Sequence, residues 1–238
     1  MDILVLASSS RGNCYALRCG DSVLLLEAGI PVSKLRKLLP VGLACVEACL
    51  VTHEHQDHAG YVRQYEEAGI PVYASMQTCG VLGIGKPVIR TKKWSYRCHD
   101  LHVGGWKVSM FSVRHDAADP VGYLIDAPDG TRVCFAIDTY LLPYQFPGVN
   151  VWMLECNYDL ETLQANIDDG VVDEAQAKRI LQSHMSVDHV CEFLIHQDLR
   201  GTEAVYLLHG SGRNLDEEKA CSRVRAAVGR PVYMGVNV

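Results

Sequence analysis

Three histidines and one aspartate able to bind metal ions occur within six residues of this 238-residue chain, and no other feature constrains its fold as strongly. The segment Thr52-His53-Glu54-His55-Gln56-Asp57-His58-Ala59-Gly60 follows the apolar run Ala48 to Val51. In an extended segment His53 and His55 project to one side, because side chains alternate along a strand. Asp57 and His58 must then turn toward a second position. A solvated histidine-rich turn is the competing interpretation, but imidazole and carboxylate at this density predict two adjacent zinc, manganese or iron ions.

Length and composition indicate a single globular domain, which we expect to cover residues 1–238. Apolar residues make up 48% of the chain, enough for a large core, and the ten cysteines are scattered like reduced core residues. Apolar runs are shorter than the ~20 residues that span a membrane, and the start lacks a secretory signal, so we expect a cytoplasmic protein without a membrane partner. The net charge of -6 gives no general attraction to nucleic acid, so a phosphate-bearing substrate requires a local positive site.

Short apolar runs separated by turn signals predict a strand-rich first half, and helical periodicity predicts a mainly helical last third. The predicted strands are Ile3 to Ala7, Tyr15 to Arg18, Val23 to Leu26, Ala48 to Thr52, Val72 to Ala74, Val108 to Val113, Val121 to Ile125, Val133 to Ile137 and Val151 to Leu154. The predicted helices are Val32 to Leu39, His58 to Ala68, Asp173 to Gln182, Val187 to His196 and Asn214 to Val228. Asp126 to Gly130 reads as a hairpin turn. Two packed sheets with helices outside would bury every apolar face.

The motif at His53, His55, Asp57 and His58 resembles the HxHxDH signature of the metallo-β-lactamase superfamily. The superfamily's later ligands have counterparts in the same order at His115, Asp138 and His209, each of which follows an apolar run. Further segments resemble the YycJ/WalJ-like branch of nucleases. They are Ala7-Ser8-Ser9-Ser10-Arg11-Gly12-Asn13-Cys14-Tyr15, His115-Asp116-Ala117-Ala118-Asp119-Pro120-Val121-Gly122-Tyr123, Leu154-Glu155-Cys156-Asn157-Tyr158-Asp159 and Ser183-His184-Met185-Ser186. The resemblance therefore extends over nearly the whole chain.

This resemblance implies an α/β fold, a four-layered αββα sandwich of two mainly antiparallel or mixed sheets. It implies that one ion is held by His53, His55 and His115, and the other by Asp57, His58 and His209, with Asp138 between them. A hydroxide bridging the two ions would be the nucleophile, and a nucleic acid, DNA rather than RNA, would be the substrate. Two divalent ions are also the largest local charge and would attract a phosphodiester despite the negative net charge.

His184 lies outside the seven ligands, and in the resembled nucleases a histidine in this place contacts the scissile phosphate and can protonate the leaving oxygen. Glu155 could accept a hydrogen bond from its ring and fix its orientation. We therefore take Asp57, His184 and Glu155 as candidate catalytic residues. Ser183, Ser186 and Asn157 are candidate substrate contacts. The structural alternative is a helix junction in which Ser186 is the N-cap.

Three residues depart from the pattern of related sequences. Glu27 stands where the superfamily usually has a shorter aspartate that supports the metal loop, Arg114 replaces a small residue, and Gly210 replaces a larger one. Ser8 to Asn13 fits either a loop lining the site or a plain turn. A basic and aromatic stretch fits either a nucleic-acid contact or a solvated face. It contains Lys86, Arg90, Lys92, Lys93, Trp94, Tyr96 and Arg97.

Two other functions are compatible with the same motif. A thioesterase or lactonase of the glyoxalase II type would use the same ions on a different substrate, and the pairing of His184 with Glu155 argues against it. A non-catalytic metal-binding module is the second alternative. Retention of all seven ligand-type residues argues against a catalytically dead binding or regulatory module, because losing one of them would not impair the binding of a partner.

Overall fold

The computed structural model describes residues 1–83, 85–88, 97 and 99–235. These residues form two compact units. The first contains Met1–Ser112 and Ala117–Arg132, and the second contains Val113–Asp116 and Val133–Gly235. No helix within the described ranges is both long and apolar enough to cross a membrane.

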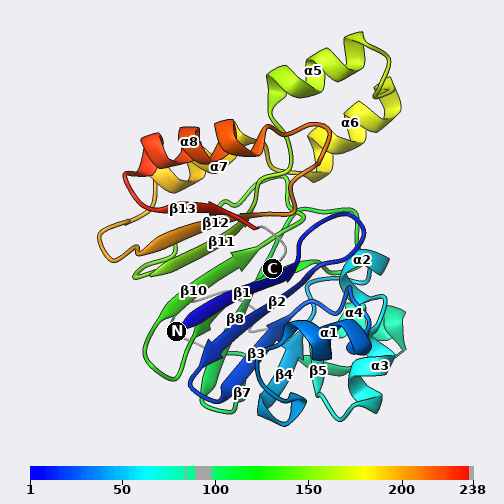
Figure 1. Cartoon of the computed structure of the whole chain (residues 1–238), viewed down its shortest axis with the longest axis vertical. Coiled ribbons are helices and arrows are strands. Elements are labelled where there is room, and N and C mark those ends of the chain that lie inside the picture. The colour runs from blue at the N-terminus through cyan, green and yellow to red at the C-terminus, as the bar shows by residue number, and fades with distance from the viewer. Residues whose placement is uncertain (84, 89–96, 98, 236–238) are drawn as a thin grey trace. The chain divides into compact units, whose positions relative to one another are not determined.

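The first unit contains a six-stranded mixed sheet with its strands in sequence order, drawn in blue to cyan in Figure 1. Its strands are β1 (Asp2–Ala7), β2 (Cys14–Cys19), β3 (Ser22–Leu26), β4 (Val46–Leu50), β5 (Val72–Ser75) and β6 (Lys86–Val88). Strands β1 to β3 pair antiparallel, and β3 to β6 pair parallel. The helices of this unit are α1 (Val32–Leu38), α2 (Gln56–Ala59), α3 (Val62–Glu67) and α4 (Met76–Leu82), with a 3-10 turn at Leu43–Cys45. Three antiparallel strands complete it: β7 (Leu101–Val103), β8 (Trp106–Ser112) and β9 (Val121–Asp126).

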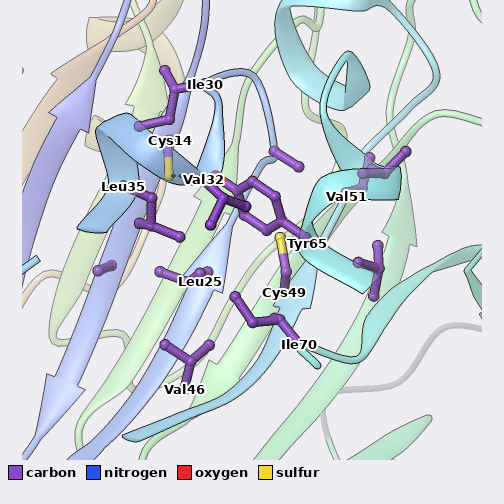
Figure 2. Packing of buried hydrophobic residues seen from close by; sticks show 14 of the residues in the cluster. Cys14, Leu25, Ile30, Val32, Leu35, Val46, Cys49, Val51, Tyr65 and Ile70 are labelled. Carbon is purple, nitrogen blue, oxygen red and sulfur yellow. Dashed lines mark hydrogen bonds between the residues drawn. The ribbon is translucent and has the colours of Figure 1, made fainter. Parts of the chain in front are cut away.

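The core of the first unit lies between its sheet and its helices, as Figure 2 shows for Leu25, Cys49 and Tyr65. The Cys14 thiol lies 3.6 Å from the Tyr65 hydroxyl inside this core. Burial raises the pKa of Cys14 to about 12, so the thiol stays neutral and packs as a small apolar side chain. The cysteines that the structure describes are free thiols, as the sequence predicts.

The second unit contains four strands that pair parallel to one another and are covered by helices. Its strands are β10 (Arg132–Ala136), β11 (Val151–Glu155), β12 (Ala204–Leu208) and β13 (Val232–Met234). Its helices are α5 (Leu160–Asp168), α6 (Glu174–Ser183), α7 (Val187–Ile195) and α8 (Glu217–Val228). In Figure 1, α7 and α8 lie side by side over β11 to β13, while α5 and α6 project away from this layer. Helices α5 and α6 have a small core of their own, made by Tyr158, Leu163, Val172 and Ala177.

Most predicted elements are present, but the prediction of a single helix from His58 to Ala68 is wrong. The structure has α2 and α3 there, separated at Gly60 and Tyr61. The Ala28 backbone N–H donates to the His58 carbonyl at 2.7 Å, and the Tyr61 N–H donates to the Ala28 carbonyl at 3.0 Å. Because a neighbouring segment uses these two groups, the helical hydrogen bonds cannot continue through them.

Two further sequence predictions have different outcomes. The turn at Asp126 to Gly130 is confirmed, since the Ala127 N–H donates to the Thr131 carbonyl at 2.9 Å and Gly130 has a φ of 90°. The centre of the basic and aromatic stretch, at Arg90, Lys92, Lys93, Trp94 and Tyr96, lies outside the described residues.

Candidate metal centre

Parallel strands place the first group of candidate ligands at one edge of the first sheet. Leu26, the last residue of β3, is in register with Leu50, the last residue of β4. The segments that follow these strands therefore meet at the same edge. Glu27 follows β3 directly, and the Thr52–His58 segment follows β4. This register explains why the motif is supported by a residue from another part of the chain.

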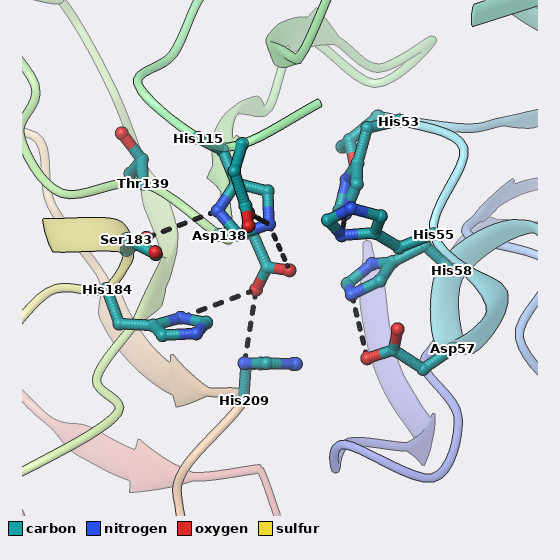
Figure 3. A network of polar contacts seen from close by, with 12 residues as sticks. His53, His55, Asp57, His58, His115, Asp138, Thr139, Ser183, His184 and His209 are labelled. Atoms are coloured by element: carbon teal, nitrogen blue, oxygen red, sulfur yellow. Dashed lines mark hydrogen bonds and ion pairs between the residues drawn. The ribbon is translucent and has the colours of Figure 1, made fainter. Parts of the chain in front are cut away.

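The four ligand-type side chains of the motif form two converging pairs. His53 Nε2 lies 3.0 Å from His55 Nδ1, and the two rings meet edge to face. His58 Nε2 lies 3.1 Å from Asp57 Oδ2, as Figure 3 shows. His53 and His58 are buried, so their ring nitrogens are held in place by packing. Each pair corresponds to one of the two ions that the resemblance implies.

Two buried polar residues support these pairs. Glu27 is fully buried and accepts the Thr52 N–H at 3.3 Å, and its other carboxylate oxygen lies 3.7 Å from His58 Nδ1. Asn13 Nδ2 lies 3.2 Å from His58 Nε2 and donates to Asp57 Oδ2 at 3.3 Å. Despite its extra methylene, Glu27 therefore reaches the metal loop, and the Ser8 to Asn13 segment contacts the candidate ligands through Asn13.

The second unit contains the other three candidate ligands, and the ends of parallel strands again position two of them. Parallel β10, β11 and β12 end together, because Ala136 is in register with Leu154, and Glu155 with Leu208. Asp138 and His209 follow two of these ends. Asp138 Oδ1 lies 3.1 Å from His209 Nδ1, and Asp138 Oδ2 lies 3.4 Å from His115 Nε2. One carboxylate thus presents a different oxygen to each of two histidines (Figure 3), as a bridging ligand would.

Helix α6 orients the His115 ring. His115 Nδ1 lies 3.3 Å from the Ser183 carbonyl oxygen, which can only accept a hydrogen bond. A hydrogen bond there uses the proton on Nδ1, which leaves Nε2 as the ring nitrogen that would bind a metal ion. Backbone carbonyls fix the tautomer of metal-binding histidines in this way.

His184 and Glu155 form a close pair in the second unit. His184 Nδ1 lies 2.5 Å from Glu155 Oε1 and 3.9 Å from Asp138 Oδ1. The fully buried Glu155 also accepts the Thr139 N–H at 2.9 Å and the Met185 N–H at 3.3 Å. Burial alone would lower the pKa of His184, but the Glu155 carboxylate outweighs it and raises the pKa. Burial would conversely raise the pKa of Glu155, and the charge of His184 lowers it.

The three candidate substrate contacts also have structural roles. Ser183 Oγ donates to the Arg179 carbonyl at 2.8 Å. The buried Ser186 caps α7 by accepting the His189 N–H at 3.1 Å. Asn157 Nδ2 donates to the His209 carbonyl at 2.9 Å. The Ser186 contact is the N-cap that the structural alternative predicts, so its contact with substrate stays a prediction.

Sequence reasoning missed two residues that hold the site together. Glu54 lies inside the motif and accepts the Ala118 N–H at 2.7 Å, which ties the motif to the segment before β9. Thr139 follows Asp138, and its hydroxyl accepts the Arg114 N–H at 3.1 Å. Their positions beside candidate ligands were the available signal. A Cβ at Gly210 would lie 3.0 Å from Leu215 Cδ2, so a larger residue there would require the Leu215 side chain to shift.

The donor set fits divalent transition-metal ions. It consists of imidazole nitrogens and carboxylate oxygens without a thiolate, which suits zinc, manganese or iron in an open site. Four of the seven candidates lie together in the first unit and three in the second. Asp138 is the strongest structural support for this fit, because each of its two carboxylate oxygens faces a separate imidazole.

Comparison with known proteins places the chain in a family. Residues 24–210 match the family model described as the beta-lactamase superfamily domain. The chain is 30% identical over 235 residues to exodeoxyribonuclease YycJ of Bacillus anthracis, with 91% of this chain and 84% of the relative covered. It is 29% identical over 238 residues to exodeoxyribonuclease WalJ of Streptococcus pneumoniae, with the same shares covered.

A solved structure shows the same fold. The metallo-beta-lactamase fold protein YhfI from Bacillus subtilis superposes with a TM-score of 0.69 at 14% identity, covering 98% of this chain and 95% of that one. The predicted fold class, a mixed α/β metallo-β-lactamase fold, is confirmed. The chain belongs to the beta-lactamase superfamily as a hydrolase of the metallo-β-lactamase fold, and within that superfamily it is similar to the YycJ and WalJ exodeoxyribonucleases.

Proposed function

We propose that this hydrolase is a metal-dependent phosphodiesterase that cleaves nucleic acid, DNA rather than RNA, as an exonuclease. The observation that carries the proposal is the pairing of His184 with the buried Glu155, next to Asp138. Hydrolysis of a phosphodiester must stabilise charge on the phosphoryl oxygens and protonate a poor leaving group. A metal centre alone serves the first need, and an oriented histidine beside it serves the second.

The metal centre in this proposal follows the ligand order of the superfamily resemblance. His53, His55 and His115 would hold one ion, Asp57, His58 and His209 would hold the other, and Asp138 would contribute to both. This assignment rests on the superfamily resemblance. It is supported by the His53–His55 pair, the Asp57–His58 pair and the two-sided contacts of Asp138. When bound, two such ions lower the pKa of a shared water and stabilise charge on the phosphoryl oxygens.

The chain's own residues would then orient and protonate the substrate. Because Glu155 accepts the proton on His184 Nδ1, the opposite nitrogen, Nε2, is left to contact the scissile phosphate and give a proton to the leaving oxygen. Ser183 and Ser186 are proposed as neutral phosphate contacts. Asn157 would act chiefly by holding the His209 backbone, with its remaining amide capacity directed to substrate. A cytoplasmic location and a single domain over residues 1–238 stay predictions.

A panel of substrates tests this function. Metal-loaded protein would be incubated with end-labelled single-stranded DNA, double-stranded DNA and RNA, and with a glutathione thioester and a lactone. We expect cleavage of DNA from an end, abolished by chelation and restored by zinc or manganese. Turnover of the thioester or lactone without cleavage of any polynucleotide would overturn the proposal in favour of the glyoxalase II-like alternative.

A further inference from the structure

The second unit contains a cavity of about 630 Å³ beside His115, and apart from His115 and Ser183 its lining residues have no role in the proposed chemistry. Its wall includes Arg114, His115, Asp116, Lys178, Arg179 and Ser183. The volume is within the range of nucleotide-sized ligand sites and exceeds what one phosphate group needs. The cavity thus borders a candidate metal ligand and has room for a larger part of a substrate.

One face of α6 forms most of the wall. Ala175, Lys178, Arg179 and Gln182 are spaced three and four residues apart, so they share a face of the helix. The opposite face turns Ala177 toward the small core between α5 and α6. The cationic residues are exposed, whereas Ala177 is buried. Packing therefore fixes which way α6 turns and directs Lys178 and Arg179 into the cavity wall.

The cavity is positively charged in a chain that is negative overall. Three cationic side chains, from Arg114, Lys178 and Arg179, face a single carboxylate, that of Asp116. Asp116 is shared between Arg179, at 3.5 Å, and His115 Nε2, at 3.2 Å. With a net charge of -6, the chain offers polyanions little general attraction, so this cluster is a local positive site in addition to the charge that bound metal ions would supply.

Hydrogen bonds also connect the segments of the cavity wall to candidate ligands. The Ser183 carbonyl at the end of α6 accepts the His115 hydrogen bond, and the Arg114 backbone N–H donates to Thr139, next to Asp138. The same short segments thus position the ligands and the cations. A strand whose scissile phosphate lies at the metal centre would place a neighbouring nucleotide within reach of α6.

We infer that this cavity is a subsite for a non-scissile nucleotide of the substrate strand, with Arg114, Lys178 and Arg179 contacting its phosphate. The inference rests on the proposed function and adds to it the way in which a polynucleotide is selected over a small ester. Binding strength in this subsite comes from phosphate charge, so it is independent of base sequence.

The test compares two double variants that each remove two positive charges from an exposed helical surface. Lys178→Gln/Arg179→Gln removes them from the cavity, and Arg36→Gln/Lys37→Gln removes them from α1 as a matched control. The dissociation constant of metal-loaded protein for a fluorescent, nuclease-resistant oligonucleotide would be measured by anisotropy over a range of salt concentrations. Thermal melting confirms that both variants are folded.

We expect the cavity variant to bind the oligonucleotide about tenfold more weakly, with a salt slope flatter by about 0.7 for each phosphate that the variant no longer neutralises. The ratio of kcat/KM for a long strand to that for a dinucleotide should fall similarly, through KM. The α1 control should bind within twofold of the original protein. Equal weakening of both variants, or of neither, would overturn the subsite.

The design separates the subsite from the proposed function. Protein that cleaves DNA but binds it equally well in the cavity variant retains the nuclease proposal and loses the subsite. Protein that cleaves no polynucleotide, but whose salt-dependent binding still depends on Lys178 and Arg179, retains the subsite and loses the nuclease proposal.

Discussion

Glu27, Asp138 and His209 have positive φ angles of 67°, 49° and 53°, and they are the non-glycine residues with this backbone among those described. Such a conformation costs of order 1–3 kcal/mol per residue and persists where the surroundings enforce it. The Glu27 backbone N–H is held by the Leu50 carbonyl at 2.8 Å. Asp138 and His209 follow strand ends that the sheet register fixes. The resemblance drew attention to all three residues, Glu27 as a departure and the other two as ligands, but their side-chain types gave no sign of this strain.

Asp138→Asn tests the bridging role at this scale. The substitution keeps the size of the side chain and removes its charge, so both ions should bind more weakly, because one carboxylate faces both histidines. Elemental analysis after dialysis measures the retained metal, with the exposed Asp168→Asn as control. Loss of a single ion would show that Asp138 serves only one position.

His184→Ala tests the proposed acid. Removing it should slow polynucleotide cleavage by roughly 10²–10⁴-fold, the effect typical of a missing general acid, while metal content stays unchanged. Bis-p-nitrophenyl phosphate should be far less affected, because its leaving group scarcely needs a proton. The exposed His196→Ala is the matched control.

Three outcomes would distinguish other roles of His184. Equal impairment on both substrates would reject the acid role and leave phosphate positioning. A joint loss of metal and activity would identify His184 as a ligand. Lowered thermal stability, with activity that recovers once the folded fraction is corrected for, would assign it a structural role.

Within each unit, the positions at which strands end determine where the candidate ligands lie. Apolar runs in the sequence predicted β3, β4, β10 and β11, and the candidate ligands follow such runs. The sequence could not predict which strands are adjacent, and that adjacency brings Glu27 to Thr52 and Asp138 to His209.

The predicted elements omit two helices, α4 and α5, and four strands, β6, β7, β12 and β13. Helix α5 was missed although Leu163 and Ile167 lie one turn apart behind the Asp159 cap, because polar residues dilute the pattern. Helix α4 was missed because it is short and contains Gly80. The break between α2 and α3 depends on hydrogen bonds with Ala28, which local periodicity cannot show.

Two helix caps in the second unit should differ in their contribution to stability. Asp159 caps α5, is buried, and accepts a hydrogen bond from Arg223 at 3.0 Å, which ties α5 to α8. Asp173 caps α6 from an exposed position.

Asp173→Ala should lower the free energy of unfolding by about 1 kcal/mol, as is typical when a helix cap is removed. Asp159→Ala should lower it by about 2 kcal/mol or more, because a charged hydrogen bond is removed as well. Urea denaturation measures both, and equal effects would show that the Arg223 hydrogen bond adds nothing.

At the scale of the whole molecule, seven candidate ligands and a cationic cavity are spread over a chain with a net charge of -6. The resemblance supplied the order of the ligands and the fold. The cavity could not be predicted, because Arg114 and the residues of α6 are distant in sequence and share a wall only through folding. Composition pointed away from nucleic acid, whereas the local charge of the second unit favours it.

Stepwise metal loading of the intact protein tests the central claim most directly, which is that this hydrolase cleaves nucleic acid with two ions. Metal-free protein would be titrated with manganese or zinc while end-labelled DNA cleavage and bound metal are followed in the same samples. We predict that nuclease activity rises as the second equivalent binds and reaches its plateau at about two ions per chain. Full activity at one equivalent, or no cleavage of DNA at two, would contradict the account.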